Sequence, residues 1–109
     1  MQVILKGKNK SYVLRLTVQN LIILESVLGK NPLEILNSFN RGTIPKITDV
    51  INVLHYSLQP FTDDNKYTLE VYEDFIADGN TFVDIIKIFK RVFEECGLLS
   101  KDEETEKNA

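Results

Sequence analysis

Few residues of this chain have the types and spacing that enzymatic chemistry needs. The single histidine, His55, could act as a general base, and the single cysteine, Cys96, could act as a nucleophile beside it. No carboxylate lies at helical spacing from His55 to orient its ring, and Cys96 falls near a helix end, where a small apolar side chain fills space. The sequence therefore favours structural roles for both, with a His55–Cys96 dyad as the alternative.

A second group with chemical potential is acidic. Clustered carboxylates could hold a hard cation: Asp63, Asp64, Glu70, Glu73, Asp74 and Asp78. The cluster lacks the alternating oxygens and central glycine of a calcium loop, so a solvated helix face is the favoured interpretation. The sequence also has no glycine-rich phosphate loop, no zinc-type cysteine or histidine pair and no nucleophile-elbow serine. We expect a non-enzymatic protein with no metal and no cofactor.

The apolar pattern predicts an α+β fold that is mainly α. Two alternating runs, 1–5 and 12–16, flank a polar turn and indicate an N-terminal β-hairpin. In the second run Tyr12, Leu14 and Leu16 share one face, which is typical of a strand covered on one side. About five short to medium helices follow, roughly at 18–28, 32–39, 47–59, 68–78 and 81–96.

The first predicted helix is apolar on nearly every side. Thr17 is a good N-cap for it, and Gly29 stands where a left-handed residue can end it. Ile23 and Val27 lie opposite the broad apolar face, which consists of Val18, Leu21, Ile22, Leu24 and Leu28. Such a helix is either the central helix of the core or partly an interface, and the pattern favours the core.

The last two predicted helices have clearer apolar faces. The fourth should turn four residues inward, namely Leu69, Tyr72, Phe75 and Ile76. The fifth carries an inward stripe of Phe82, Ile85, Ile86, Phe89, Phe93 and Cys96. A shoulder beside that stripe holds more apolar surface than we expect one small core to cover. We therefore predict that a partner contacts Ile23 and Val27 on the first helix and the shoulder residues Ile88, Val92 and Leu99.

Length and composition indicate a single domain. The 109 residues fit one globular domain, 1–99, followed by a hydrophilic, acidic tail, 100–109, that we expect to be disordered. One cysteine excludes an intrachain disulfide. The N-terminus lacks a signal pattern, and no apolar stretch is long enough to cross a bilayer, so we expect a soluble intracellular protein.

Charge is distributed unevenly along the chain. The net charge is −3, with +4 on residues 1–60 and −7 on residues 61–109. This acidic balance argues against nucleic-acid binding, for which the basic hairpin residues Lys6, Lys8, Lys10 and Arg15 are the best candidates. The asymmetry is compatible with head-to-tail self-association, but two solvated faces are the favoured interpretation.

An ordered set of short motifs resembles a known family. The motifs are Tyr12 to Thr17, Leu24-Glu25, Leu28-Gly29, Pro32-Leu33, Ile44-Pro45, Asp49-Val50, Leu54, Tyr72, Gly79 and Gly97. Over most of residues 10–98, this order resembles the small tail assembly chaperones of long-tailed (siphovirus-like) bacteriophages and prophages.

The resemblance implies a non-enzymatic function in virion morphogenesis. Such a protein binds and solubilises the tape-measure protein and helps to recruit tail tube subunits in the cytoplasm of the bacterial host, without remaining in the mature virion. In such families a ribosomal frameshift often appends a second domain, and residues 100–109 lie where that extension would start. The alternative is a small phage or mobile-element regulator that binds and inhibits a host protein.

Overall fold

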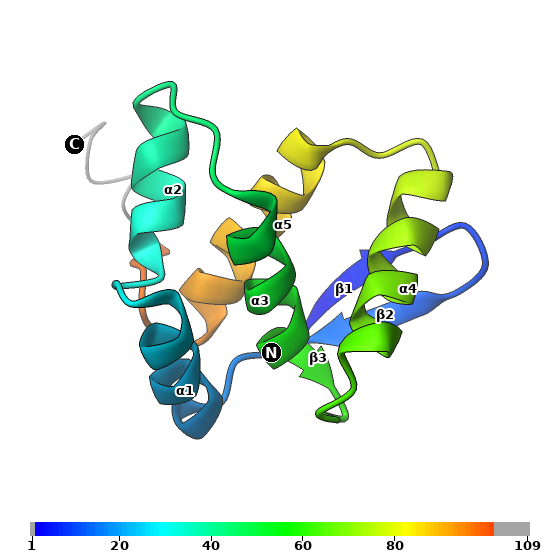
Figure 1. The fold of residues 1–109 in the computed structure, drawn as a ribbon, viewed down its shortest axis with the longest axis horizontal. Coiled ribbons are helices and arrows are strands. Elements are labelled where there is room, and N and C mark those ends of the chain that lie inside the picture. The colour runs from blue at the N-terminus through cyan, green and yellow to red at the C-terminus, as the bar shows by residue number, and fades with distance from the viewer. Residues whose placement is uncertain (1, 102–109) are drawn as a thin grey trace.

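The computed structural model describes residues 2–101, which form a small sheet and five helices (Figure 1). The order is β1 (Val3–Lys6), β2 (Ser11–Leu14), α1 (Val18–Leu28), α2 (Leu33–Asn40), α3 (Ile47–Ser57), β3 (Leu58–Gln59), α4 (Asn65–Ala77) and α5 (Phe82–Glu95). In Figure 1, α3 lies between the α1 and α2 pair on the left and α4 with the sheet on the right. The predicted mainly α fold with an N-terminal hairpin is confirmed. The tail predicted to be disordered lies, from residue 102 on, outside the described residues.

The hairpin pairs as the alternating pattern predicts. β1 and β2 are antiparallel, and the cross-strand neighbours Val3 and Leu14, and Leu5 and Tyr12, all turn their side chains into the core. The third strand, β3, was not predicted, because the third helix was expected to run up to Pro60. A residue before proline is driven out of the helical region, so the chain extends at 58–59 and pairs antiparallel with β2.

The core joins one face of the sheet to the helices. α5 supplies its centre through Ile85, Ile86, Phe89 and Phe93, which confirms the main part of the predicted stripe. This helix begins at a capping box in which Thr81 and Asp84 satisfy each other's backbone N–H groups. α5 contacts β1, α2 and α3, so several elements cover its apolar face at once.

α1 is placed differently from the favoured prediction. Its ends are as predicted: the Thr17 hydroxyl accepts from the Asn20 N–H at 3.1 Å, and Gly29 ends the helix with φ of 72°. However, α1 packs on α3 from one side only, and just Asn20 and Leu24 are buried. The interpretation of α1 as the central core helix is therefore wrong, and most of its circumference is not buried in the fold.

α4 begins earlier than predicted and is rotated about its axis. The Asp64 carboxylate caps it by accepting from the Lys66 and Tyr67 N–H groups at 3.0 and 3.4 Å. The buried residues are Thr68, Val71, Asp74 and Phe75, whereas the predicted inward residues Leu69 and Ile76 are exposed. The rotation has a physical reason: Thr68 and Asp74 have hydrogen-bond partners in the fold, so burying them is not penalised.

Candidate partner-binding surface

α1 presents aliphatic side chains to solvent on two sides. The exposed fractions are 73% for Val18, 62% for Ile22, 48% for Val27 and 37% for Ile23. Ile23 and Val27 are one turn apart and form one ridge, which we call the α1 ridge. Val18 and Ile22 form a second ridge, and the polar residues Gln19 and Ser26 separate the two. The exposure of these apolar side chains on one short helix makes α1 a candidate interaction surface.

The fold distributes the five predicted partner-binding residues over two environments. Ile23 and Val27 are exposed on α1 and are available to a partner. Ile88 and Leu99 are half-buried and pack against the core, and Val92 is 1% exposed. Val92 is thus a core residue rather than part of an exposed shoulder. The correction follows from the position of α5, which contacts β1, α2 and α3 and so buries a wider face than one apolar stripe.

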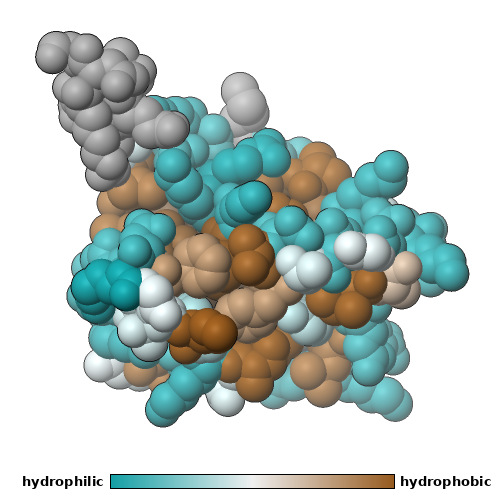
Figure 2. Space-filling view, turned by 90° about the horizontal axis from the view of Figure 1, so that it is seen from above, coloured by the Kyte–Doolittle hydropathy of each residue, from teal (hydrophilic) through white to brown (hydrophobic). Residues whose placement is uncertain are grey.

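A second apolar surface lies at the end of the molecule that is uppermost in Figure 1. Figure 2 looks down on this end and shows apolar residues gathered across its middle. The α2–α3 loop, the start of α3 and the first turn of α5 reach this end, and they carry the exposed residues Ile44, Ile47 and Val83, respectively. Ile44 was not among the predicted partner-binding residues, because a loop residue has no periodicity that would assign it to a face. At 75% exposure it is the most exposed large aliphatic residue among those described.

A small groove adjoins the second ridge of α1. Its volume is about 140 Å³, and its lining residues are Leu21, Ile22, Glu25, Asn31, Pro32 and Leu98. Leu21, Ile22 and Glu25 come from α1, Asn31 and Pro32 from the α1–α2 turn, and Leu98 from the segment after α5. The Asn31 carboxamide oxygen accepts from the Leu33 N–H at 2.9 Å, which fixes the turn. The groove is therefore mainly apolar with one carboxylate in its lining.

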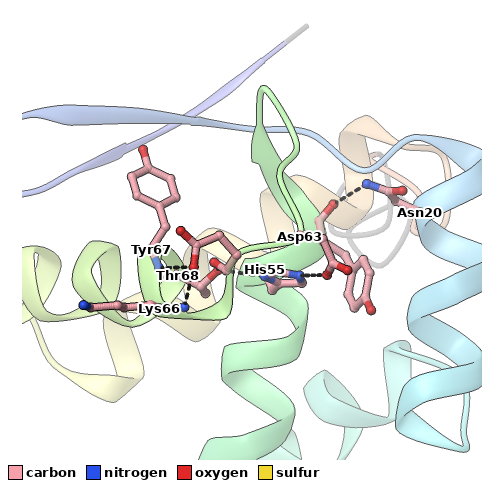
Figure 3. Close-up of polar contacts among 8 residues, drawn as sticks. Asn20, His55, Asp63, Lys66, Tyr67 and Thr68 are labelled. Atoms are coloured by element: carbon pink, nitrogen blue, oxygen red, sulfur yellow. Dashed lines mark hydrogen bonds and ion pairs between the residues drawn. The ribbon is translucent and has the colours of Figure 1, made fainter.

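The only histidine is buried and lies in a polar network that runs from buried Thr68 to the exposed carboxylate of Asp63 (Figure 3). His55 Nδ1 is 2.8 Å from the Thr68 hydroxyl, and His55 Nε2 is 3.2 Å from a carboxylate oxygen of Asp63. Asp63 is thus the orienting carboxylate that helical spacing could not reveal, because it comes from the loop before α4. Both ring nitrogens are engaged, so His55 is not paired with Cys96, whose thiol donates to the Phe93 carbonyl at 3.4 Å.

This network resembles a hydroxyl–imidazole–carboxylate relay, but its hydroxyl is inaccessible. Thr68 is 1% exposed, so no substrate can approach its oxygen in this fold. The His55 ring also packs edge-on against Tyr56 and Phe61, with ring centroids 4.8 and 5.5 Å away. Nearby, the Asn20 side chain donates to the Tyr56 carbonyl at 3.1 Å and ties α1 to α3 (Figure 3). These contacts make the network a structural joint between α3, α4 and α1.

Asp74 on α4 is also buried, and its carboxylate fixes the hairpin to this helix. Its carboxylate accepts from the Tyr12 hydroxyl at 2.8 Å, the Asn9 side-chain amide at 2.8 Å and the Asn9 backbone N–H at 3.0 Å. Burial opposes ionisation of this carboxyl group, but hydrogen bonds from Tyr12, Asn9 and Lys10 outweigh it and lower the pKa of Asp74. Asp74 therefore does not belong to a solvated helix face, unlike its exposed neighbours Glu70 and Glu73.

The Asp74 contacts also place the basic hairpin loop beside the acidic residues of α4. The basic hairpin loop lies against the acidic helix α4 of the same molecule, where Lys10, Glu70 and Glu73 line a shared open pocket. The Lys10 ammonium group is also 5.5 Å from the centre of the Tyr12 ring. Opposite charges that are distant in the sequence are thus neighbours in the fold, which weakens the argument for self-association through the hairpin.

The Tyr12–Asp74 pair predicts a loss of stability at high pH. Burial, followed by the hydrogen bond to Asp74, raises the pKa of Tyr12 from 10.0 to about 12. Between these values the unfolded chain releases the phenol proton and the folded chain keeps it, so the free energy of unfolding should fall by roughly 2 kcal/mol from pH 10 to 12. Thermal melts of the wild type and Tyr12→Phe over this range test the effect. An equally steep decline in Tyr12→Phe would contradict it.

Residues 2–101 contain neither a metal-binding cluster nor a membrane-spanning helix. No group of three or more His, Cys, Asp or Glu side chains in this range could hold a metal ion. No helix in this range combines the length and the apolar character that crossing a membrane requires.

Comparisons with known proteins give one match. A family model described as "Family of unknown function (DUF6096)" matches residues 3–109. Searches of curated proteins and of solved structures find no match. The matched residues include every surface described above, from β1 to the segment after α5.

Proposed function

We propose that this chain, which belongs to the DUF6096 family of unknown function, is a tail assembly chaperone of a long-tailed bacteriophage or prophage. The surfaces of the chain itself support the proposal. In this proposal it binds the hydrophobic tape-measure protein, keeps it soluble and helps to recruit tail tube subunits. It acts in the cytoplasm of the bacterial host and is absent from the mature virion. It is not an enzyme.

The observation that carries the proposal is the exposure of α1. A protein of this size has enough core to bury one amphipathic helix, yet α1 leaves Val18, Ile22 and Val27 about half exposed or more. Exposure of such a surface to water is unfavourable, and covering it with a partner lowers the free energy by roughly 25 cal/mol for each Å² of apolar area buried. A client with long hydrophobic helices suits this surface, because helices pack along one another through ridges of side chains one turn apart.

The position of α1 at the edge of the fold also supports a client-binding role. It contacts the rest of the protein mainly through α3, and the Asn20 hydrogen bond to Tyr56 secures its orientation. This hydrogen bond restrains α1 against α3, and such restraint limits the conformational entropy that binding would cost. The apolar surface at Ile44 and Ile47 offers a second area on which a long client could continue.

Co-expression with a tape-measure protein tests the proposal. We expect the tape-measure protein encoded beside the gene for this chain to move from the insoluble to the soluble fraction, and to co-purify with an affinity tag on this chain. The matched control is the same tape-measure protein expressed without the chain. A tape-measure protein that stays insoluble and does not co-purify would contradict the proposal and favour a regulator with a host target.

A further inference from the structure

The groove beside α1 combines an apolar lining with a carboxylate that has no partner within the described residues. Its apolar lining comes from Leu21, Ile22, Pro32 and Leu98, and its volume of about 140 Å³ suits one aliphatic side chain. Glu25 lies one turn beyond Leu21 on the same stripe of α1. No ion pair or side-chain hydrogen bond involves Glu25 among residues 2–101, in contrast to Glu34 and Asp49, which pair with Arg41 and Lys30. The groove therefore suits an aliphatic side chain with a basic residue one turn away.

α5 carries that complementary pair. Val83 is 41% exposed in the first turn of α5, and Lys87 is exposed one turn later on the same side of the helix. No ion pair involves Lys87 in the described part of the chain. Leu69 on α4 also has a basic residue one turn away, Lys66, so reversing Lys66 tests the alternative pair. The other large aliphatic residues that are exposed on helices have no basic residue one turn away on the same helix; these are Val18, Ile22, Ile23, Val27, Ile47 and Ile76.

The two halves cannot meet within one molecule. Leu98 of the groove follows the C-terminal end of α5, whereas Val83 lies in its first turn. α5 has 14 residues and is therefore about 21 Å long, so these positions are at opposite ends of it. Contact between them requires a second copy, and the interface would be head to tail, a type that builds chains or rings of subunits.

We propose that the groove of Leu21, Ile22, Glu25, Asn31, Pro32 and Leu98 binds the first turns of α5 of a second copy. Val83 of that copy enters the groove, and its Lys87 pairs with Glu25. The segment 100–109 is a poorer occupant, because its only apolar residue is Ala109. This contact goes beyond the proposed function and does not depend on it: it uses Ile22, which is also exposed on α1, but leaves the α1 ridge of Ile23 and Val27 uncovered.

Charge reversal tests the contact in the full chain. Sedimentation velocity over a range of concentrations should show reversible self-association that weakens as salt is added. Glu25→Lys alone and Lys87→Glu alone should each weaken association about fivefold to tenfold, and the double variant should restore it. Lys66→Glu, which reverses an exposed lysine on α4, is the matched control and should leave association unchanged. Unchanged melting temperatures would show that all variants fold.

Three results would overturn the proposal. The first is a wild-type chain that remains monomeric at about 1 mM in low salt. The second is a double variant that associates no better than the single variants. The third is a Glu25→Lys variant that self-associates normally but no longer retains the tape-measure protein, which would assign the groove to the client. Loss of tape-measure binding by the α1 ridge variants would be a separate result, so the two proposals can fail independently.

Discussion

Replacing Asp74 with alanine is expected to lower the melting temperature by roughly 10 °C. The substitution removes the acceptor for the Tyr12 hydroxyl and for both N–H donors of Asn9, and the Tyr12 hydroxyl is left buried without a partner. The hairpin would lose its main polar contact with α4. Thermal melts followed by circular dichroism measure the effect. Glu73→Ala, at an exposed site one residue earlier on α4, is the matched control and should change little.

Gly7 makes this prediction more specific, because its backbone approaches the same carboxylate. A Cβ atom at Gly7 would lie 2.7 Å from the Asp74 Cγ and 3.0 Å from the Lys10 carbonyl oxygen. The Asp74 side chain cannot yield without breaking its hydrogen bonds, so Gly7→Ala should also destabilise the protein. The two substitutions should not be additive, because Asp74→Ala removes the group that the new methyl meets. Strict additivity would show that Asp74 does not hold this turn against α4.

The second large effect is expected at the α1 ridge. Changing both Ile23 and Val27 to aspartate should abolish co-purification of the tape-measure protein, because two charges would replace the aliphatic side chains that the client is proposed to cover. The free protein should melt within a few degrees of the wild type, since exposed positions contribute little to the core. The measurement is the amount of tape-measure protein retained per tagged chain.

A matched double variant on α4 serves as the control for the α1 ridge. Leu69→Asp with Ile76→Asp also removes two exposed aliphatic residues from a helix, and it should leave client retention intact. Ile88→Asp should behave differently from both, because Ile88 packs against the core and its replacement should lower the melting temperature. Equal loss of client with the α1 and α4 variants would indicate nonspecific adhesion rather than a defined surface.

Local patterns in the sequence were sufficient for most of the fold. The hairpin, the Thr17 cap, the Gly29 end and the α5 stripe each depend on residues a few positions apart, so alternation, capping and helical periodicity could reveal them. The features that were missed depend on distant partners. β3 exists only because 58–59 reaches β2, and α4 turns Thr68 and Asp74 inward because His55 and Tyr12 bond them.

Only part of the candidate partner-binding surface could be predicted, because local patterns reveal only the features that depend on residues close together in the sequence. Ile23 and Val27 were identified because they lie opposite the broad apolar face of their own helix, and both are exposed. Val92 was misassigned because the width of the face that α5 buries is set by three neighbouring elements rather than by α5 itself. Ile44 could not be assigned at all, since a loop has no repeating pattern. Exposure in the folded chain is needed to find such residues.

The most direct test of the central claim is methyl NMR of this chain with and without a soluble tape-measure fragment. If α1 binds the client, the methyl signals of Ile23 and Val27 should shift or broaden as the fragment is added, while those of the buried residues Leu24 and Val53 stay in place. The same titration of the Ile23→Asp, Val27→Asp variant should show no binding. Binding that perturbs other surfaces and leaves the α1 methyl signals unchanged would contradict the account, as would no binding at all.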